Sequence, residues 1–334
     1  MIKIGITIGD PAGVGPELIL RLLPYLDPEK VYVVYGEKKV MRAVQKELGM
    51  DFPAQEVQNV QEVEEPGLYL VDLNVCDRER PEPSVTSGKV AVAYLGRAVA
   101  DAICGRLHGI LTMPLHKFWA SRAGFSYQGQ TEFLAKACNC RDYAMLMYSE
   151  KIKVVPFTTH IPLREVPQRV KKEEIVKKVK LVVREYAKLF GVEPSVGVLG
   201  LNPHAGDMGA IGQEDMEEIL PAVEALKEEG YAVEGPLSPD SAFLREGLDL
   251  YLCMYHDQGL IPFKLLAFSE GVNLTLGLPF VRTSPDHGVA YDIAWRGVAQ
   301  IGPSLRALKL CETIGERLCS RVENPHERRH RLAP

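Results

Sequence analysis

Three histidines follow apolar runs that read as buried strands, and this spacing suggests a metal site. His160, His204 and His256 come after the predicted strands 152–156, 195–201 and 248–255. The carboxyl ends of neighbouring strands in an open α/β sheet lie about 5 Å apart, so these imidazoles can converge on one ion. Three imidazoles that leave a coordination position open are typical of a catalytic metal. The alternative is three unrelated histidines, each satisfied by one hydrogen bond, but Asp257 beside His256 and Asp207 after His204 favour the metal.

A second group of polar side chains lies in the Gly-rich stretch 259–288 and suggests an anion site. Its members are Lys264, Asn273 and Arg282. Arginine offers a planar fork that matches phosphate or carboxylate, and lysine offers a mobile charge. A solvated surface role for these residues is the alternative.

The Gly-rich segment Gly9–Glu17 follows the first predicted strand and opens a helix. It lacks the G-x-G-x-x-G spacing, and Pro16 removes one amide donor, so a tight structural turn is the first interpretation, with Asp10 in a site wall as the second. Residues 86–90 lack the spacing of a phosphate loop, and no G-x-S-x-G elbow occurs.

Composition excludes several classes of protein. The 334 residues suit two α/β domains, and a net charge of −5 gives no electrostatic reason to expect nucleic acid or a membrane as partner. The first residues lack a signal-peptide pattern and no apolar run is long enough for a membrane span, which predicts a cytoplasmic protein. Seven cysteines without a C-x-x-C pair argue against disulfides and a zinc knuckle, although Cys138 and Cys140 could chelate.

Short apolar runs alternate with amphipathic stretches, which predicts an α/β fold with a mainly parallel sheet. The predicted strands are 2–8, 31–35, 67–71, 109–112, 152–156, 195–201 and 248–255. Helices are predicted at 90–103 with Ser87 as N-cap, at 175–189, at 215–229 ended by Gly230, and at 303–322. Residues 80–83 are predicted to form a loop.

Several motifs resemble one family, the 4-hydroxythreonine-4-phosphate dehydrogenases of pyridoxal-phosphate biosynthesis. The matching segments, in chain order, are 6–17, 113–117, 129–133, 158–163, 201–206, 235–240, 255–260 and 273–284. The resemblance covers the chain from the first strand to about Val298. The strongest matches are Y-H-D-Q-G-L at 255–260 and N-L-T-L-G-L-P-F-V-R-T-S at 273–284.

The resemblance implies two α/β/α domains of the isocitrate/isopropylmalate dehydrogenase type with an active-site cleft between them. We expect a first domain of 1–130 plus about 285–325, a second of 131–284 that carries the metal and most substrate residues, and a tail at 326–334. A homodimer is implied, with residues of both subunits in each active site. One divalent ion per site, zinc, magnesium or cobalt, is implied on His160, His204 and His256.

The implied substrate contacts are Gln130, Thr131, Lys264, Asn273, Arg282 and Asp240. Lys264 is the first candidate for the catalytic base and Asp240 the second, while Arg282 and Asn273 are expected to anchor the phosphate end. NAD(P) is expected as cofactor, with Asp286, His287 and Asp292 on the dinucleotide side.

The implied reaction is the oxidation of 4-phosphooxy-L-threonine to 2-amino-3-oxo-4-phosphooxybutanoate, followed by decarboxylation to 3-amino-2-oxopropyl phosphate. The alternatives are a paralogous dehydrogenase of threonate or erythronate 4-phosphate, and a metal-dependent hydrolase or metabolite-binding protein. The sequence departs from the family at Gln130, where histidine is common and where glutamine cannot titrate. It also departs at Trp295-Arg296-Gly297, where Gly-Lys-Gly is frequent.

Overall fold

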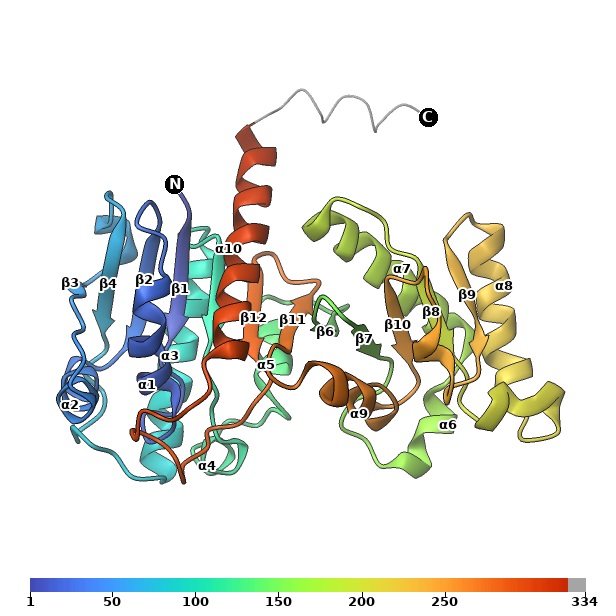
Figure 1. The fold of residues 1–334 in the computed structure, drawn as a ribbon, viewed down its shortest axis with the longest axis horizontal. Coiled ribbons are helices and arrows are strands. Elements are labelled where there is room, and N and C mark those ends of the chain that lie inside the picture. Colours follow the sequence, from blue (N-terminus) through green and yellow to red (C-terminus); the bar gives the residue numbers. More distant parts are fainter. Residues whose placement is uncertain (324–334) are drawn as a thin grey trace. The chain divides into compact units, whose positions relative to one another are not determined.

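Strands and helices alternate along the chain in the computed structural model, which describes residues 1–323 (Figure 1). The predicted tail at 326–334 lies outside the described residues. Two compact units are present: unit 1 comprises residues 1–139 and the described chain from Leu278 onward, and unit 2 comprises Cys140–Gly277. Residues 131–139 and 278–284, which the sequence analysis assigned to the second domain, belong to unit 1. For the later stretch the reason is that strand β12 (Val281–Pro285) pairs with a strand of unit 1.

Unit 1 contains six strands in the order β3-β4-β2-β1-β5-β12, and all their pairings are parallel. Besides β12 these are β1 (Lys3–Thr7), β2 (Val31–Gly36), β3 (Gln55–Val57), β4 (Gly67–Asp72) and β5 (Gly109–Thr112). All side chains of β2 are buried, which explains its continuous apolar run. The chain builds outward from β1 on one side and returns at β5 on the other, so the strand order reverses between β1 and β5.

The helices of unit 1 are α1 (Gly15–Leu22), α2 (Lys38–Leu48), α3 (Val85–Ile103), α4 (Lys117–Arg122), α5 (Gln130–Ala137) and α10 (Gly302–Glu323). Helix α3 packs on β1, β2 and β5, whereas α10 packs on β12 and β5 (Figure 1). The predicted N-cap Ser87 is wrong. Ser84 caps α3, and Ser87 is the N3 residue of a capping box in which the hydroxyl of each serine accepts a hydrogen bond from the backbone amide of the other.

Unit 2 contains six strands in the order β11-β6-β7-β10-β8-β9. They are β6 (Ala144–Tyr148), β7 (Lys153–Pro156), β8 (Val196–Leu199), β9 (Val233–Leu237), β10 (Leu250–Cys253) and β11 (Val272–Leu276). Strand β6 runs antiparallel to β11 and β7, and the other pairings are parallel. The prediction of a mainly parallel sheet is therefore confirmed, with one antiparallel insertion.

The helices of unit 2 are α6 (Val166–Arg169), α7 (Lys172–Phe190), α8 (Leu220–Glu228) and α9 (His256–Ala267). Short 3₁₀ segments are η1 (Leu23–Tyr25), η2 (Val60–Glu62), η3 (Leu163–Glu165) and η6 (Ala242–Leu244). The segment η4 (Pro203–Gly209) contains left-handed residues, and η5 (Asp215–Ile219) is a π-helical turn that precedes α8. The helix predicted at 175–189 corresponds to α7, which buries Ile175, Val179, Val182, Tyr186 and Leu189 on one face. Gly191 ends the helix in the left-handed conformation that glycine adopts without steric cost.

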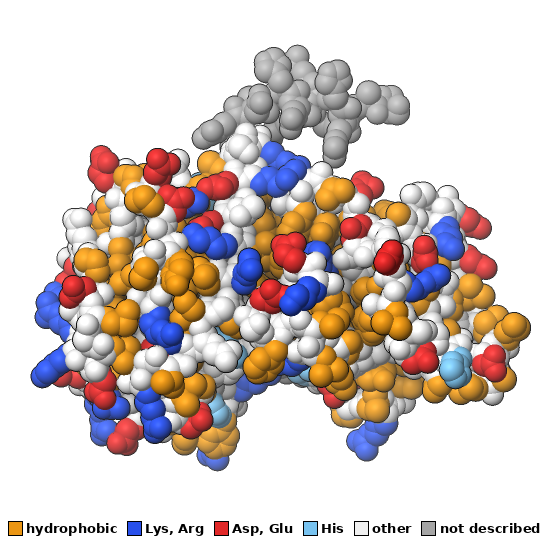
Figure 2. All heavy atoms as spheres, in the orientation of Figure 1, with side chains coloured by type: hydrophobic (Ala, Val, Ile, Leu, Met, Phe, Trp, Pro, Cys, Tyr) orange, Lys and Arg blue, Asp and Glu red, His pale blue; other side chains and the backbone are white. Residues whose placement is uncertain are grey.

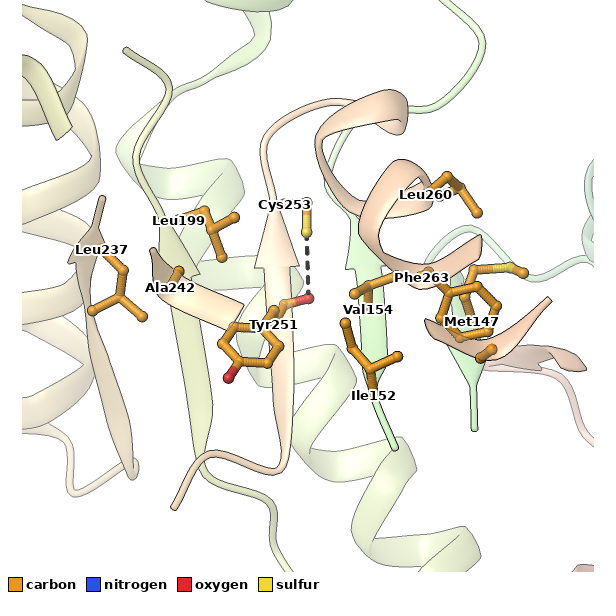
Figure 3. Packing of buried hydrophobic residues seen from close by; sticks show 11 residues of the cluster. Met147, Ile152, Val154, Leu199, Leu237, Ala242, Tyr251, Cys253, Leu260 and Phe263 are labelled. Carbon is orange, nitrogen blue, oxygen red and sulfur yellow. Dashed lines mark hydrogen bonds between the residues drawn. The ribbon is translucent and has the colours of Figure 1, made fainter. Parts of the chain in front are cut away.

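The core that supports the strand ends of unit 2 lies beneath α9 (Figure 3). Leu260 and Phe263 of α9 pack with Val154 of β7 and Cys253 of β10. Phe263 is fully buried, so its truncation to alanine costs about 3–5 kcal/mol. This packing fixes the start of α9 relative to the two strands.

No helix within residues 1–323 combines the length and hydropathy needed to cross a bilayer. Acidic and basic side chains are interspersed over the face drawn in Figure 2. This mixture matches the small net charge of the chain.

Candidate functional site

His160 and His256 lie together at the carboxyl ends of two neighbouring parallel strands. Strand β7 pairs with β10, and His160 follows the first while His256 follows the second. The two imidazole centroids are 5.6 Å apart. The backbone between β7 and His160 is fixed because Thr158 donates to the carbonyl of Met254 through its amide at 3.3 Å and its hydroxyl at 2.7 Å.

The first residue of α9 is His256, and Asp257 lies beside its ring. Nδ1 of His256 and Oδ1 of Asp257 are 2.7 Å apart. A carboxylate that accepts from Nδ1 fixes the tautomer and leaves Nε2 as a lone-pair donor, an arrangement common for metal-binding histidines. Gln258 joins the strand ends: its side chain accepts from the amide of Met254 at 2.7 Å and donates to the carbonyl of Gly200 at 2.8 Å.

His204 follows β8, the other neighbour of β10, in a left-handed turn. The residues from His204 to Met208 all have positive φ, between 43° and 80°. The turn is braced by Asp215, which is fully buried and accepts from the amides of Leu201 at 2.7 Å and Asn202 at 3.1 Å. Sequence reasoning missed this role of Asp215 because the residue reads only as an acidic helix start.

The structure therefore brings two of the three predicted metal ligands together within one chain. All three follow buried strands that are neighbours in the sheet, as the sequence indicates. Among residues 1–323, however, no group of three His, Cys, Asp or Glu side chains is arranged to hold a metal ion. The three-histidine site stays a prediction.

Three predicted substrate residues occupy different elements of unit 2. Lys264 is exposed on α9 and Asp240 is exposed after β9. The pKa of Asp240 is lowered, mainly because Ser238 donates to its carboxylate at 2.7 Å, with a smaller contribution from the nearby His204. Asn273 lies in β11, and its Oδ1 is buried without a hydrogen-bond partner among the described residues.

Three further predicted substrate residues, Gln130, Thr131 and Arg282, meet in unit 1. Arg282 belongs to β12 and is 2% exposed, which excludes the solvated surface role given as its alternative. It donates from Nη2 to Oε1 of Gln130 at 3.1 Å and from Nη1 to Oγ1 of Thr131 at 3.4 Å. Gln130 in turn donates to the carbonyl of Met113 at 3.1 Å.

Thr112, at the end of β5, is a partner of Arg282 that sequence reasoning missed. Its Oγ1 accepts from Nε of Arg282 at 3.1 Å and from Nη2 at 2.8 Å. Its position directly before the Met113-Pro114 turn, at a strand end, is the signal that could have identified it. Burial lowers the pKa of Arg282 to about 10, while the nearby Glu132 acts in the opposite direction. A cation in this environment favours an anionic ligand, because the ligand restores the charge balance.

The Gly-rich turn after β1 is structural, as its first interpretation held. The amides of Gly13 and Val14 donate to the carbonyls of Asp10 and Val289, both at 2.9 Å. A Cβ at Gly15 would lie 1.9 Å from the carbonyl oxygen of Ile8, so only glycine fits there. The amides before α1 are therefore occupied and leave little for an anion.

The side chain of Asp10 is fully buried above this turn. It accepts from the amide of Ala12 at 3.0 Å, from the hydroxyl of Tyr291 at 2.6 Å and from that of Ser87 at 3.3 Å. Burial raises the pKa of Asp10, and the hydrogen bond from Tyr291 is the largest opposing effect. The pKa of Tyr291 is also raised, first by burial and then by its hydrogen bond to Asp10.

The predicted dinucleotide-side residues lie in the segment after β12. Asp286 and His287 are half-buried, and Asp292 is exposed in the turn that contains Tyr291. Nδ1 of His287 lies 3.0 Å from the carbonyl oxygen of Gly288.

Comparisons with known proteins agree on one family. The profile of the family described as "Pyridoxal phosphate biosynthetic protein PdxA" matches residues 29–311. The chain is 60% identical over 317 residues to the 4-hydroxythreonine-4-phosphate dehydrogenase of Aquifex aeolicus (strain VF5), covering 95% of this chain and 99% of that protein. It is 39% identical to the D-threonate 4-phosphate dehydrogenase of Pectobacterium atrosepticum, covering 89% of this chain and 94% of that protein.

A solved structure supports the same assignment. The crystal structure of 4-hydroxythreonine-4-phosphate dehydrogenase from Klebsiella pneumoniae superposes with a TM-score of 0.83 at 35% identity, covering 94% of this chain and all of that one. The α/β fold expected from the sequence is thereby confirmed. By sequence and by fold, the chain belongs to the pyridoxal phosphate biosynthetic protein PdxA family.

Proposed function

We propose that the protein is an NAD(P)-dependent, divalent-metal-dependent dehydrogenase. It oxidises 4-phosphooxy-L-threonine to 2-amino-3-oxo-4-phosphooxybutanoate, which loses CO2 to give 3-amino-2-oxopropyl phosphate in pyridoxal-phosphate biosynthesis. The observation that carries the proposal is the pair His160 and His256 at neighbouring strand ends, with centroids 5.6 Å apart. The activity named for the 60% identical relative supports the choice of substrate.

The donor set of unit 2 fits a divalent ion. Two imidazoles converge, Asp257 fixes the ring of one of them, and His204 follows the next strand. Neutral imidazole accepts zinc, cobalt and other divalent ions. His160, His204 and His256 would hold the ion, whose chemistry is to bind the substrate hydroxyl and lower its pKa while the nicotinamide accepts hydride.

The chain's own residues then bind the substrate and move its protons. Lys264 is the proposed base that takes the hydroxyl proton as hydride leaves the same carbon, and Asp240 is the second candidate. The C–H bond and the O–H bond break and a C=O bond forms. The product is a 3-oxo acid, so its C–CO2 bond can break with the electron pair delocalised onto the new carbonyl, and the carbon that lost CO2 then takes up a proton to give the ketone.

Arg282 of unit 1 binds the phosphate of the substrate, with Gln130 and Thr131 as further contacts. Thr112 accepts two hydrogen bonds from the guanidinium and so fixes its plane. A different role follows for Asn273, which the sequence analysis placed at the phosphate. Its buried Oδ1 is a hydrogen-bond acceptor, and it suits the substrate ammonium group better than a phosphate oxygen.

A homodimer forms part of the proposal, with residues of both subunits in each active site. Helix α9 carries exposed apolar side chains at Ile261 (59% exposed), Leu265 (81%) and, directly after its end, Phe268 (71%). Their spacing of four and three residues places them on one face of the helix. A second copy covering this face would bury apolar surface next to His256 and Lys264, and it could supply a metal ligand that one chain does not bring to the pair.

The cofactor is NAD or NADP, and Asp286, His287 and Asp292 are its proposed contacts. Cytoplasmic localisation is proposed because pyridoxal-phosphate biosynthesis draws on soluble phosphorylated metabolites.

A second candidate substrate is a phosphorylated sugar acid such as D-threonate 4-phosphate. One relative, 39% identical over 310 residues, carries that activity in its name. Gln130 is the residue that supports D-threonate 4-phosphate as a substrate, because it places an amide where the family commonly has histidine. D-Threonate 4-phosphate lacks the ammonium group, so it leaves Oδ1 of Asn273 without a charged donor.

The proposal is tested by coupled binding and turnover. Purified protein loaded with zinc, cobalt or magnesium should reduce NAD or NADP with 4-phosphooxy-L-threonine, and Lys264→Met should lower kcat with little change in KM. The control is Lys264→Arg, which keeps a cation but is a far poorer base. If neither 4-phosphooxy-L-threonine nor D-threonate 4-phosphate supports the reduction of NAD or NADP with any of these metals, the proposal is contradicted.

A further inference from the structure

The carboxyl-end edge of the unit 1 sheet carries a polar cluster, with Asp10 buried and His116 and Tyr291 half-buried, that the proposed reaction does not use. Asp10 follows β1, His116 follows β5, and Tyr291 comes from the segment after β12. The strand order reverses between β1 and β5. Open α/β sheets bind ligands at such a reversal, so a cluster built there warrants a functional explanation.

The three side chains form a connected stack. The hydroxyl of Tyr291 donates to Oδ2 of Asp10 at 2.6 Å, within the range for a charge-assisted hydrogen bond. The ring of Tyr291 stacks on the imidazole of His116 with centroids 5.3 Å apart and an interplanar angle of 19°. Nδ1 of His116 is buried without a hydrogen-bond partner among the described residues, so the imidazole is held there chiefly by stacking.

The segment that carries Tyr291 is attached to unit 1 on both sides of that residue. The carbonyl of Val289 accepts from the amide of Val14 at 2.9 Å, and the amide of Ala299 donates to Glu17 at 3.0 Å. Between these points the hydroxyl of Tyr291 donates to Asp10, and Asp292 is the next residue in the chain. Movement of Tyr291 would therefore displace the residues proposed to contact the cofactor.

We propose that Asp10 and Tyr291 are positioning residues that latch the segment 286–297 onto the β1 and β5 ends, and so preorganise it for the nicotinamide dinucleotide. The inference rests on the proposed function only for the identity of the ligand. Tyr291 already orders the segment in the free protein, so binding of the dinucleotide does not have to offset the conformational entropy lost in ordering it. Loss of the latch weakens cofactor binding and leaves the anion site at Arg282 intact.

The two tryptophans of the chain provide a readout that is independent of activity. Trp295 is buried, with the guanidinium of Arg80 5.5 Å from its ring centroid, and it lies four residues after Tyr291. Trp119 lies on α4, close to His116 in sequence. In a Trp119→Phe background, the emission of Trp295 alone reports on the segment.

The experiment compares Tyr291→Phe and Asp10→Asn with the Trp119→Phe parent. Tyr291→Phe keeps the stacking ring and removes only the hydroxyl. We expect greater acrylamide quenching of Trp295. We also expect the Kd for NAD or NADP to rise about tenfold, because the variant loses roughly one charge-assisted hydrogen bond. Asp10→Asn keeps the shape and should give a smaller change of the same sign.

The matched control is Tyr69→Phe in the same background. Tyr69 lies on β4, and the substitution removes its hydroxyl, which donates to the carbonyl of Glu65 at 3.0 Å. It should change neither quenching nor Kd. Unchanged quenching and Kd in Tyr291→Phe would overturn the latch. If the parent binds neither dinucleotide, the proposed function fails, and the quenching comparison still decides whether Tyr291 holds the segment.

Discussion

Arg282 and Thr112 are joined by two hydrogen bonds, because Nε and Nη2 of the guanidinium donate to the same Oγ1 at 3.1 and 2.8 Å. A single hydroxyl at the end of β5 thus sets the plane of a cation on β12, and β5 and β12 are paired strands. The orientation of the proposed phosphate-binding group is therefore built into the sheet.

Replacing Thr112 with valine should weaken phosphate recognition. Valine matches the shape of threonine but leaves two buried N–H groups of Arg282 without their acceptor, at a cost of about 1–3 kcal/mol. We expect KM for the phosphorylated substrate to rise about tenfold with a smaller change in kcat, measured by steady-state kinetics. Thr112→Ser retains the hydroxyl and should behave like the parent; an unchanged KM in Thr112→Val would place the phosphate elsewhere.

Gln130→His should introduce a pH dependence that the parent lacks at this position. Oε1 of Gln130 accepts from Arg282, whereas a protonated imidazole would repel the guanidinium. Histidine titrates near pH 6.5, so KM of the variant should increase as the pH falls below about 6.5. KM measured across pH for parent and variant checks this, and parallel profiles would show that residue 130 does not act on Arg282.

His256→Ala should remove the divalent ion while the chain still folds, because the ring lies at a strand end and adds little to the core. We expect metal content measured by atomic emission to fall to background, as it should for His160→Ala and His204→Ala. His108→Asn, at a histidine in unit 1, is the control and should retain the metal. Full metal occupancy in all three site variants would rule out the histidine site.

Most of the strands could be predicted, but β3, β6, β9, β11 and β12 were missed, and for two of these the physical cause is clear. Strand β2 was found because every one of its side chains is buried and apolar. Strand β3 was missed because Gln55 and Glu56 are exposed on its three-residue edge, and β12 because Arg282, Thr283 and Ser284 make it polar although it is buried.

Residues of the candidate site also divide into those with a local sequence signal and those without one. The histidines were identified because they follow continuous apolar strands, a local signal. Thr112 and Asp215 were not, because their importance comes from partners 170 and 14 residues away that only folding brings close. The bond between Asp10 and Tyr291 spans 281 residues and has no local signature.

Stability should decrease as the solution becomes acidic, and His108 contributes to this. Its Nδ1 accepts from the amide of Lys3 at 3.0 Å, so the folded ring is neutral. Burial lowers the pKa of His108 below 6.5, so the unfolded chain takes up a proton first as the pH falls. The contribution of neutral His108 to the free energy of unfolding is fully present above about pH 6.5, and it is lost as the pH falls through that value toward the folded pKa.

His108→Asn keeps an acceptor near the position of Nδ1 and cannot titrate. The difference in free energy of unfolding between neutral and mildly acidic pH should therefore be smaller in this variant than in the parent, as measured by urea denaturation. An equal or larger difference would show that His108 is not the group responsible.

The central claim is that the chain oxidises 4-phosphooxy-L-threonine with a metal held by its histidines. The most direct measurement is the rate of NAD(P)H formation from this substrate by parent protein, first freed of metal with a chelator and then titrated with a divalent ion. The account predicts no turnover in the metal-free protein and recovery that saturates at one ion per site. Turnover that persists without metal, or no turnover at any metal concentration, would contradict it.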